Sequence, residues 1–492
     1  MTALVATARE RTTGSVLAWA LGIAALMRLA TLGLYPVSDT TEARYAEIAR
    51  KMAELGDWVT PWYDYGVPFW GKPPLSTWLT AASFKLLGVN EFAARLPYFL
   101  AAVLIAWLVW DWMRQRGARE AMLATTLLSG TALYFVAAGA VMTDMALLIG
   151  TMLAMRGFWI GLHGSEPRRR RERWLLFIGL AVGLLAKGPI ALVLAGLPIV
   201  LWALTTGNLG SAWRALPWLR GSVLTLALAA PWYLLAEQHT PGFLNYFLIG
   251  EHWYRFTVPG WSGDRYGVAH AVPRGTIWLY ALAACAPWTV LLPFAAIGRR
   301  RAAPAGVPAE ERAWWRYLLL WGLAPCLFFT ISGNIIWTYV LPGLPALSML
   351  AAGWLERDPR RRGIDTLVAA GLVFTTVAFT SVLVAQQVTG DFKSAKAVVA
   401  AYEARKSGDD ALLFVGGHRY SPAFYGRGKA EQLDGIAELA ERMRGNGASS
   451  SGRGKVFVAL RDRQDHELPP ELRDRLHFQG RFDTYELFYL RR

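Results

Sequence analysis

The sequence is poor in charged side chains and in cysteine. Of its 492 residues, 18% are Asp, Glu, Lys or Arg, whereas 54% are hydrophobic. Soluble domains carry nearer a quarter of charged residues, so the composition excludes an ordinary soluble protein. The two cysteines, Cys285 and Cys326, lie in apolar runs. This is typical of small buried side chains, and no disulfide framework or cysteine metal site is expected.

Two further absences concern motifs. There is no internal repeat of the kind common in transporters. There is also no glycine fingerprint for a dinucleotide or nucleotide-sugar site, so no nucleotide cofactor is expected.

Long apolar segments dominate what is present. Runs of about 20 hydrophobic residues recur, which predicts a polytopic α-helical membrane protein with about 11–13 transmembrane helices. The first run, Ser15–Tyr35, is longer than a signal-peptide core and no small-x-small cleavage site follows it. We therefore expect a retained first span.

The formal net charge is +15, and the basic residues lie in short loops between spans. Loop charge alternates: Arg-rich loops follow the even spans, whereas acids and polar aromatics collect in loops 36–90, 143–144, 187–189, 238–274 and 332–337. The positive-inside rule then predicts a cytoplasmic N-terminus and places the second set of loops outside a bacterial inner membrane. Membrane lipids, and not nucleic acid, are the expected partners of the basic residues.

The last hundred residues change character. Residues 1–388 form the predicted membrane domain, and residues 389–492 a small soluble α/β domain on the outer side. Strands are predicted at Ala411–Val415, Val456–Leu460 and Tyr485–Leu490, and helices at Ser394–Arg405 and Gly435–Arg444.

The loop Val37–Trp78 is polar, aromatic and rich in ionisable groups, and it predicts the active site. Within it, Thr41–Leu55 has helical periodicity, with one broad apolar face that predicts a helix lying flat on the membrane. A second short helix is predicted at Leu75–Leu87, opened by prolines. Asp39 and Glu42 stand at the start of the first helix. They could cap it, or act as a general base or a metal ligand.

Other ionisable residues extend this site. Lys72, beside a helix start, is a candidate phosphate contact, with snorkelling as the alternative. Asp144 could be a helix cap or a functional group near membrane depth. Lys187 lies in a broken apolar segment and requires an anion, either a lipid phosphate or a carboxylate such as Asp144.

The second polar loop offers a weaker hypothesis. Glu251 and His252 could bind a metal together with His270, although adjacent positions do not share a helix face. Arg255 follows one turn after Glu251.

Six motifs carry a resemblance to a known family. They are DTTEARYAEIARKM with GDWVTP, GKPPL, TDMAL, LAKGP, EHWYRF and WTYVLPGLPAL, in this order between about Ser15 and Leu355. The sequence thereby resembles the bacterial lipid A aminoarabinose transferases (ArnT-like) of the protein O-mannosyltransferase superfamily, which are GT-C glycosyltransferases.

The resemblance implies a GT-C fold, a polyprenyl-phosphate sugar donor and transfer to a lipid, glycan or protein acceptor outside the cytoplasm. It places the essential acid at Asp39 or Glu42, and we favour Asp39. Where family members often read Asp-Glu before x-Arg-Tyr, this chain has Thr41-Glu42. Where they have Glu before Lys-Pro, this chain has Gly71. That glutamate helps to hold a divalent metal in the family, so a metal here is in doubt.

The chemistry of the reaction follows from its leaving group. A lipid phosphate is already acidic, so it requires cations and not a general acid. Asp39 would deprotonate a hydroxyl acceptor, but would only orient an acceptor that is already an anionic phosphate, and direct attack would invert the sugar. A transporter of lipid-linked sugars and a protein O-mannosyltransferase-type activity are the alternative functions. The candidate substrate-binding residues are Arg44, Tyr45, Lys72, Asp144, Lys187, Arg255 and Tyr339.

Overall fold

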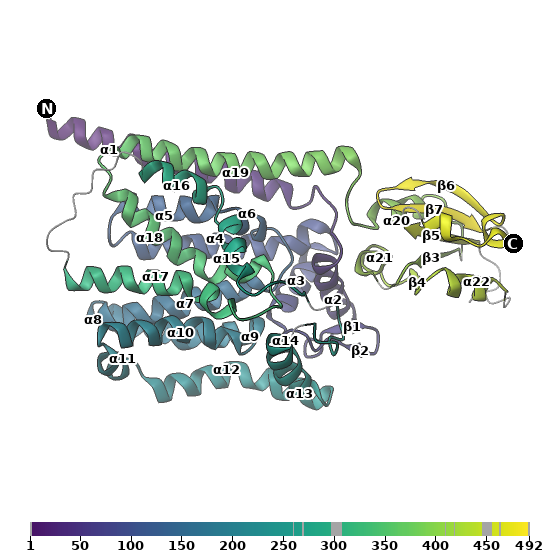
Figure 1. The fold of residues 1–492 in the computed structure, drawn as a ribbon, viewed down its shortest axis with the longest axis horizontal. Helices are drawn as coiled ribbons and strands as arrows, with labels where there is room; N and C mark the ends of the chain where they lie inside the picture. Colours follow the sequence, from purple (N-terminus) through teal and green to yellow (C-terminus); the bar gives the residue numbers. More distant parts are fainter. Residues whose placement is uncertain are drawn as a thin grey trace.

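The structure is a computed structural model that describes residues 2–258, 260–267, 270–296, 308–408, 410–417, 419–444, 455–461 and 464–490. A helical body occupies most of the chain, and a small α/β unit lies at one end of it (Figure 1).

The long helices of the body run along the long axis of the molecule (Figure 1). Its first half contains α1 (Thr2–Thr31), α2 (Thr41–Leu55), α3 (Leu75–Leu87), α4 (Glu91–Met113), α5 (Ala118–Gly130), α6 (Ala132–Ala137), α7 (Asp144–His163), α8 (Glu166–Glu172), α9 (Trp174–Lys187) and α10 (Ile190–Thr206). Its second half contains α11 (Leu209–Ala215), α12 (Trp218–His239), α13 (Phe243–Asn245), the π-helix η1 (Tyr246–Tyr254), α14 (Arg255–Thr257), α15 (Thr276–Ala284), α16 (Trp288–Ala296), α17 (Ala309–Phe329), the 3₁₀ helix η2 (Trp337–Gly343), α18 (Leu344–Glu356) and α19 (Arg361–Thr389).

Within the described ranges, five helical segments are long and apolar enough to cross a membrane: α4, α7, α12, η2 with α18, and α19. The predicted break at residues 187–189 is confirmed, because α9 ends at Lys187 and α10 begins at Ile190. Gly188 has φ +81° there, and Pro189 precedes the new helix. A left-handed glycine followed by proline ends one helix and starts the next.

Two of the predicted spans are interrupted. The predicted span Ala121–Val141 is broken at Thr131, between α5 and α6, and the predicted span Gly275–Ile297 is broken between α15 and α16. The two breaks meet, since the backbone N–H of Ala132 donates to the carbonyl of Ala286 at 2.8 Å. Irregular backbone within a membrane protein requires such internal partners.

The predicted helices Thr41–Leu55 and Leu75–Leu87 are confirmed as α2 and α3. Burial on α2 is not limited to its apolar face. Glu47 and Lys51 are each only 1% exposed. Arg50 Nε contacts Glu47 Oε2 at 2.6 Å, and Lys51 Nζ contacts Asp64 Oδ1 at 2.9 Å, in the hairpin of β1 (Trp62–Asp64) and β2 (Val67–Pro68). Pairing with opposite charges allows the hairpin to cover the polar face.

The C-terminal unit contains a five-stranded sheet in the order β4-β3-β5-β7-β6. Its elements are α20 (Lys396–Glu403), β3 (Ala411–Val415), α21 (Tyr420–Tyr425), β4 (Glu431–Leu433), α22 (Ile436–Arg444), β5 (Val456–Arg461), η3 (Gln464–Glu467), α23 (Pro470–Arg473), β6 (Leu476–Phe482) and β7 (Tyr485–Leu490). Strand β3 is parallel to β4 and β5, whereas β7 is antiparallel to β5 and β6. The three predicted strands are confirmed. The sequence reading missed β4, which is short, and β6, whose exposed polar residues hide the strand pattern.

Candidate active site

Segments far apart in the chain, among them α2, α3 and α14, lie at the end of the body nearest the C-terminal unit (Figure 1). They bring cations and carboxylates together there. Lys72, from the loop before α3, places Nζ 2.8 Å from Oε2 of Glu251 in η1. Arg255, one turn after Glu251, contacts its Oε1 at 3.0 Å and Asp264 Oδ2 at 3.3 Å. The two candidate phosphate-binding cations therefore share one buried carboxylate.

The charge state of Glu251 is set by these neighbours. Burial alone would raise the pKa of its carboxyl group, but the charges of Lys72 and Arg255 outweigh burial and lower the pKa below 4.5. Glu251 is therefore ionised at neutral pH, and it holds the two cations in place.

Lys187 at the end of α9 and Asp144 at the start of α7 form a second ion pair. Lys187 Nζ lies 2.6 Å from Asp144 Oδ1 and 4.5 Å from the centre of the Tyr339 ring. Of the two anions expected beside Lys187, a lipid phosphate or a carboxylate, the structure shows the carboxylate of Asp144. The break that positions the pair needs glycine, because a Cβ at Gly188 would lie 2.5 Å from the Phe247 ring.

Helix α2 contributes Arg44 and Tyr45 to the cluster that contains Arg255 and Asp264. Arg44 Nη1 donates to the carbonyl of Tyr266 at 2.7 Å, and its guanidinium lies over the rings of Tyr45 and Tyr420. Tyr45 is within electrostatic range of Arg44, Lys187 and Arg255. The cations predicted from separate motifs thus converge around one tyrosine.

Two donors in this cluster lack a protein acceptor. The Nε atoms of Arg44 and Arg255 are buried and make no hydrogen bond within the described part of the chain. A buried guanidinium donor without an acceptor is costly, and a phosphate oxygen is an acceptor that suits it.

Asp39 faces the C-terminal unit. Its Oδ1 accepts the backbone N–H groups of Tyr420 and Ser421, each at 3.0 Å, and its Oδ2 accepts the Ser421 hydroxyl. These N–H groups are at the start of α21, so the carboxylate caps that helix from another part of the chain.

Glu42 is held by Arg95 of α4. Arg95 Nε donates to Oε1 at 2.8 Å and Nη2 to Oε2 at 2.7 Å, a two-bond pairing with a fully buried guanidinium. Both acids at the start of α2 are therefore occupied by protein donors.

The three predicted metal ligands do not fit a metal site. Both oxygens of Glu251 face cations, as described above. His252 contacts the carbonyls of Phe247 and Lys187 through its two ring nitrogens. His270 uses its backbone N–H on Asn334. Across the described ranges, no three His, Cys, Asp or Glu side chains converge as metal ligands.

Gly71 stands where the resemblance places a metal-binding glutamate, and the structure leaves little space for a side chain at this position. A Cβ at Gly71 would lie 2.9 Å from the Phe69 ring and 3.4 Å from Tyr266. Aromatic rings occupy the space that a longer side chain would need.

The pKa of His270 is lowered by burial and by nearby cations. Desolvation, and then the charges of Arg255 and Arg44, lower the pKa of its imidazole below 6.5. The ring is therefore mainly neutral at pH 7.

The sequence reading missed four residues of the site. They are Arg95, Asp264, Tyr266 and Tyr420. Asp264 carried a usable signal, since it is an acid in the second polar loop. Tyr420 carried none, because its role depends on the docking of the C-terminal unit: its hydroxyl pairs with that of Tyr63 at 2.9 Å.

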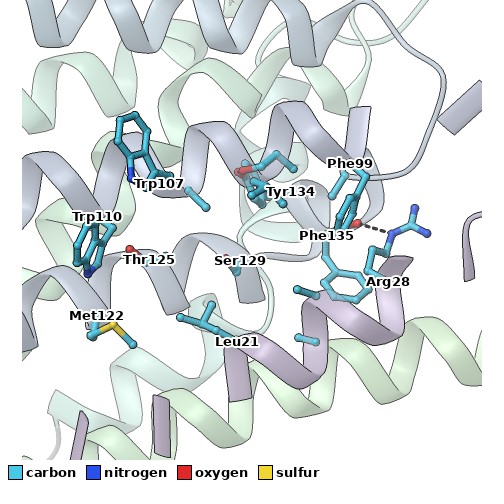
Figure 2. Close-up of a pocket in the computed structure, with 16 residues that line it drawn as sticks. Leu21, Arg28, Phe99, Trp107, Trp110, Met122, Thr125, Ser129, Tyr134 and Phe135 are labelled. Carbon is cyan, nitrogen blue, oxygen red and sulfur yellow. Dashed lines mark hydrogen bonds between the residues drawn. The ribbon is translucent and has the colours of Figure 1, made fainter. Parts of the chain in front are cut away.

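A separate apolar pocket lies between α1, α4, α5 and α6 (Figure 2). It has a volume of about 340 Å³ and is lined by Leu21, Trp107 and Trp110, among others. Arg28 borders it but donates from Nε to the Phe135 carbonyl at 3.1 Å. The pocket offers room for hydrocarbon and not a constellation of reactive groups.

Comparison with known proteins agrees with this arrangement. The chain matches the family of dolichyl-phosphate-mannose-protein mannosyltransferases over residues 17–247. It is 32% identical over 325 residues to the undecaprenyl phosphate-alpha-4-amino-4-deoxy-L-arabinose arabinosyl transferase of Edwardsiella ictaluri. The matched residues make up 64% of this chain and 55% of that protein. The corresponding protein of Erwinia tasmaniensis is 31% identical over 337 residues, 67% of this chain and 57% of that protein. The chain thus spans little more than half the length of these relatives.

The fold comparison covers nearly the whole chain. The crystal structure of ArnT from Cupriavidus metallidurans bound to undecaprenyl phosphate superposes with a TM-score of 0.78 at 21% identity, over 96% of this chain and 97% of that one. Its apo state gives 0.76. The protein therefore is a multi-pass membrane protein with the GT-C fold. In sequence it is similar to the aminoarabinose transferases and to the mannosyltransferase family model, which confirms the resemblance carried by its motifs.

Proposed function

We propose that the protein is an inverting glycosyltransferase that moves a sugar from a polyprenyl-phosphate donor, of the undecaprenyl type, to a phosphate group of an envelope lipid such as lipid A. The observation that carries the proposal is the pairing of Lys72 and Arg255 with the single buried carboxylate of Glu251. The buried Nε donors of Arg44 and Arg255 lie in the same cluster and make no hydrogen bond within the described part of the chain. The names of its relatives support the same donor.

In this mechanism the cations stabilise the leaving group. Acceptor oxygen attacks the anomeric carbon, the bond from that carbon to the donor phosphate breaks, and the electron pair leaves on the phosphate. Lys72 and Arg255 would hold that phosphate, with the unpaired Nε of Arg255 and Arg44 as additional donors. Tyr339 and Asp144 would keep Lys187 in position.

The state of the two acids favours a phosphate acceptor. Asp39 and Glu42 each accept hydrogen bonds from protein donors, and an anionic acceptor needs no general base. We propose that Asp39 orients the acceptor side of the site through its contact with α21.

We also propose an inner-membrane orientation with the N-terminus in the cytoplasm and the site and C-terminal unit outside. Its support is charge: α8, which carries Arg168–Arg171, lies at the end of the body opposite α2 and β1 (Figure 1).

The test uses purified protein in nanodiscs, with undecaprenyl-phosphate aminoarabinose as donor and lipid A as acceptor, and mass spectrometry as the readout. We expect transfer by the wild type and a loss of about 100-fold or more in Lys72→Met. Lys85→Met, an exposed lysine at the end of α3, is the matched control and should transfer normally.

Asp39→Asn separates the two acceptor chemistries. With a phosphate acceptor we expect a loss of less than about tenfold, whereas loss of a general base would cost about 10²–10⁴-fold. A wild type that moves the lipid across vesicles without transferring sugar would be a flippase and would refute the proposal.

A further inference from the structure

A second polar hollow lies at the end of the body opposite the candidate active site. It has a volume of about 400 Å³ and lies between the end of α7, α8 and α11. Its polar lining is His163, Arg169, Asn208, Ser211 and Arg214. In Figure 1, α8 and α11 lie at the far left, whereas α2 and β1 lie at the right of the body.

The hollow is cationic. Its lining contains two arginines and no carboxylate. Among the described residues, Arg214 has no carboxylate partner within ion-pairing distance, and Arg169 is only 3.5 Å from the exposed Glu166. An exposed pair of this kind contributes little, so it leaves Arg169 available to an anion.

The donors around the arginines suit a phosphate. Asn208 uses its amide group on Thr206 Oγ1 at 3.0 Å, which fixes the side chain beside α11. The Ser211 hydroxyl is a second neutral donor next to the two guanidinium groups, whereas the His163 ring lines the hollow with its Nδ1 on the Trp159 carbonyl at 3.3 Å. Arginine pairs with phosphate through two parallel hydrogen bonds.

The rim of the hollow identifies where that phosphate comes from. Next to the lining residues of α11, Leu209 is 55% exposed and Trp213 is 69% exposed. A short helix with exposed Leu and Trp beside Arg is typical of the membrane interface, where tryptophan lies at head-group level. A soluble phosphate compound would gain nothing from this apolar rim, whereas the acyl chains of a lipid would cover it.

We infer that this hollow is a binding site for the phosphodiester head group of an anionic phospholipid, such as phosphatidylglycerol, with Arg169 and Arg214 as its charged contacts and Leu209 and Trp213 against the acyl chains. The site is independent of the transfer reaction proposed above. Basic pockets at membrane-helix ends bind anionic lipid head groups by the same physical rule.

The test compares lipid retention by the full chain. The protein is purified from nanodiscs containing phosphatidylglycerol and phosphatidylcholine at equal amounts, and bound lipid is counted by native mass spectrometry. We expect selective phosphatidylglycerol retention, reduced at least fivefold in Arg169→Gln/Arg214→Gln and largely restored in Arg169→Lys/Arg214→Lys.

The control pair is Arg170→Gln/Arg220→Gln. Both residues are exposed near the same end of the body but do not line the hollow, and the change in net charge is the same. Equal losses in both pairs would show a general effect of surface charge and would overturn the inference. It would also be overturned by unchanged retention in the hollow pair. Release of the bound lipid by millimolar inorganic phosphate would show that the site reads free phosphate and would overturn it as well.

Discussion

Asp39 accepts the backbone N–H of Tyr420 at 3.0 Å, although the two residues are 381 positions apart in the chain. The acid that opens the first polar loop is therefore also the anchor of α21. Through Tyr420, the C-terminal unit reaches the ring of Tyr63 and the guanidinium of Arg44. The C-terminal unit thus forms one wall of the candidate site.

The first prediction concerns this anchor. Asp39→Ala removes an ionised acceptor from three donors, and hydrogen bonds to charged groups contribute about 1.5–3 kcal/mol each. We expect faster amide hydrogen exchange at residues 420–425, with the sheet itself unaffected. Asp391→Ala, an exposed acid after α19, should leave the exchange unchanged. Unaltered protection in the Asp39 variant would contradict the anchoring role.

The second prediction concerns the pair of Asp144 and Lys187. Asp144→Asn leaves a buried lysine without its counter-charge, which should lower the free energy of unfolding by about 3–5 kcal/mol. In Asp144→Leu/Lys187→Met both charges are gone, so thermal stability should return while sugar transfer stays lost. Thermal melting and the transfer assay on the same samples separate the two roles. A double variant that is active would show that Lys187 has a structural role only.

The third prediction concerns Glu42. Glu42→Gln keeps the shape of the side chain but removes the charge paired with buried Arg95. We expect a lower melting temperature, and transfer that falls only in proportion to the folded fraction. Loss of transfer by 100-fold or more in folded protein would instead assign Glu42 a direct part in the chemistry.

The fourth prediction concerns pH. Because the pKa of His270 is lowered below 6.5, the folded state disfavours its protonated form, and stability falls as pH drops from about 6.5 downward. His270→Gln should flatten the decline in melting temperature between pH 7 and 5. Glu251 has a pKa below 4.5. It stays ionised across that window, and its contribution should be lost only below pH 4.5. A variant with the same slope as wild type would exclude His270 as the titrating group.

Local sequence patterns predicted the helices around the site well. The bounds of α2 and α3 followed from apolar periodicity and flanking turn residues, and the break after Lys187 followed from Gly188-Pro189. The tertiary contacts of individual side chains could not be predicted from these local patterns. Glu47 and Lys51 look like solvent-facing residues, and only the tertiary placement of the β1–β2 hairpin explains their burial. The grouping of Glu251, His252 and His270 as a metal site rested on residue type within one polar loop, whereas the oxygens of Glu251 face Lys72 and Arg255 and the ring nitrogens of His252 face backbone carbonyls.

Glu251 has a consequence for turnover. Its carboxylate lies beside Lys72 and Arg255 in the ligand-free site. In the proposed reaction, an arriving phosphate would therefore compete with a resident anion for these two cations. When the polyprenyl phosphate departs, the same carboxylate would pair with them again, so product release would exchange one anion for another.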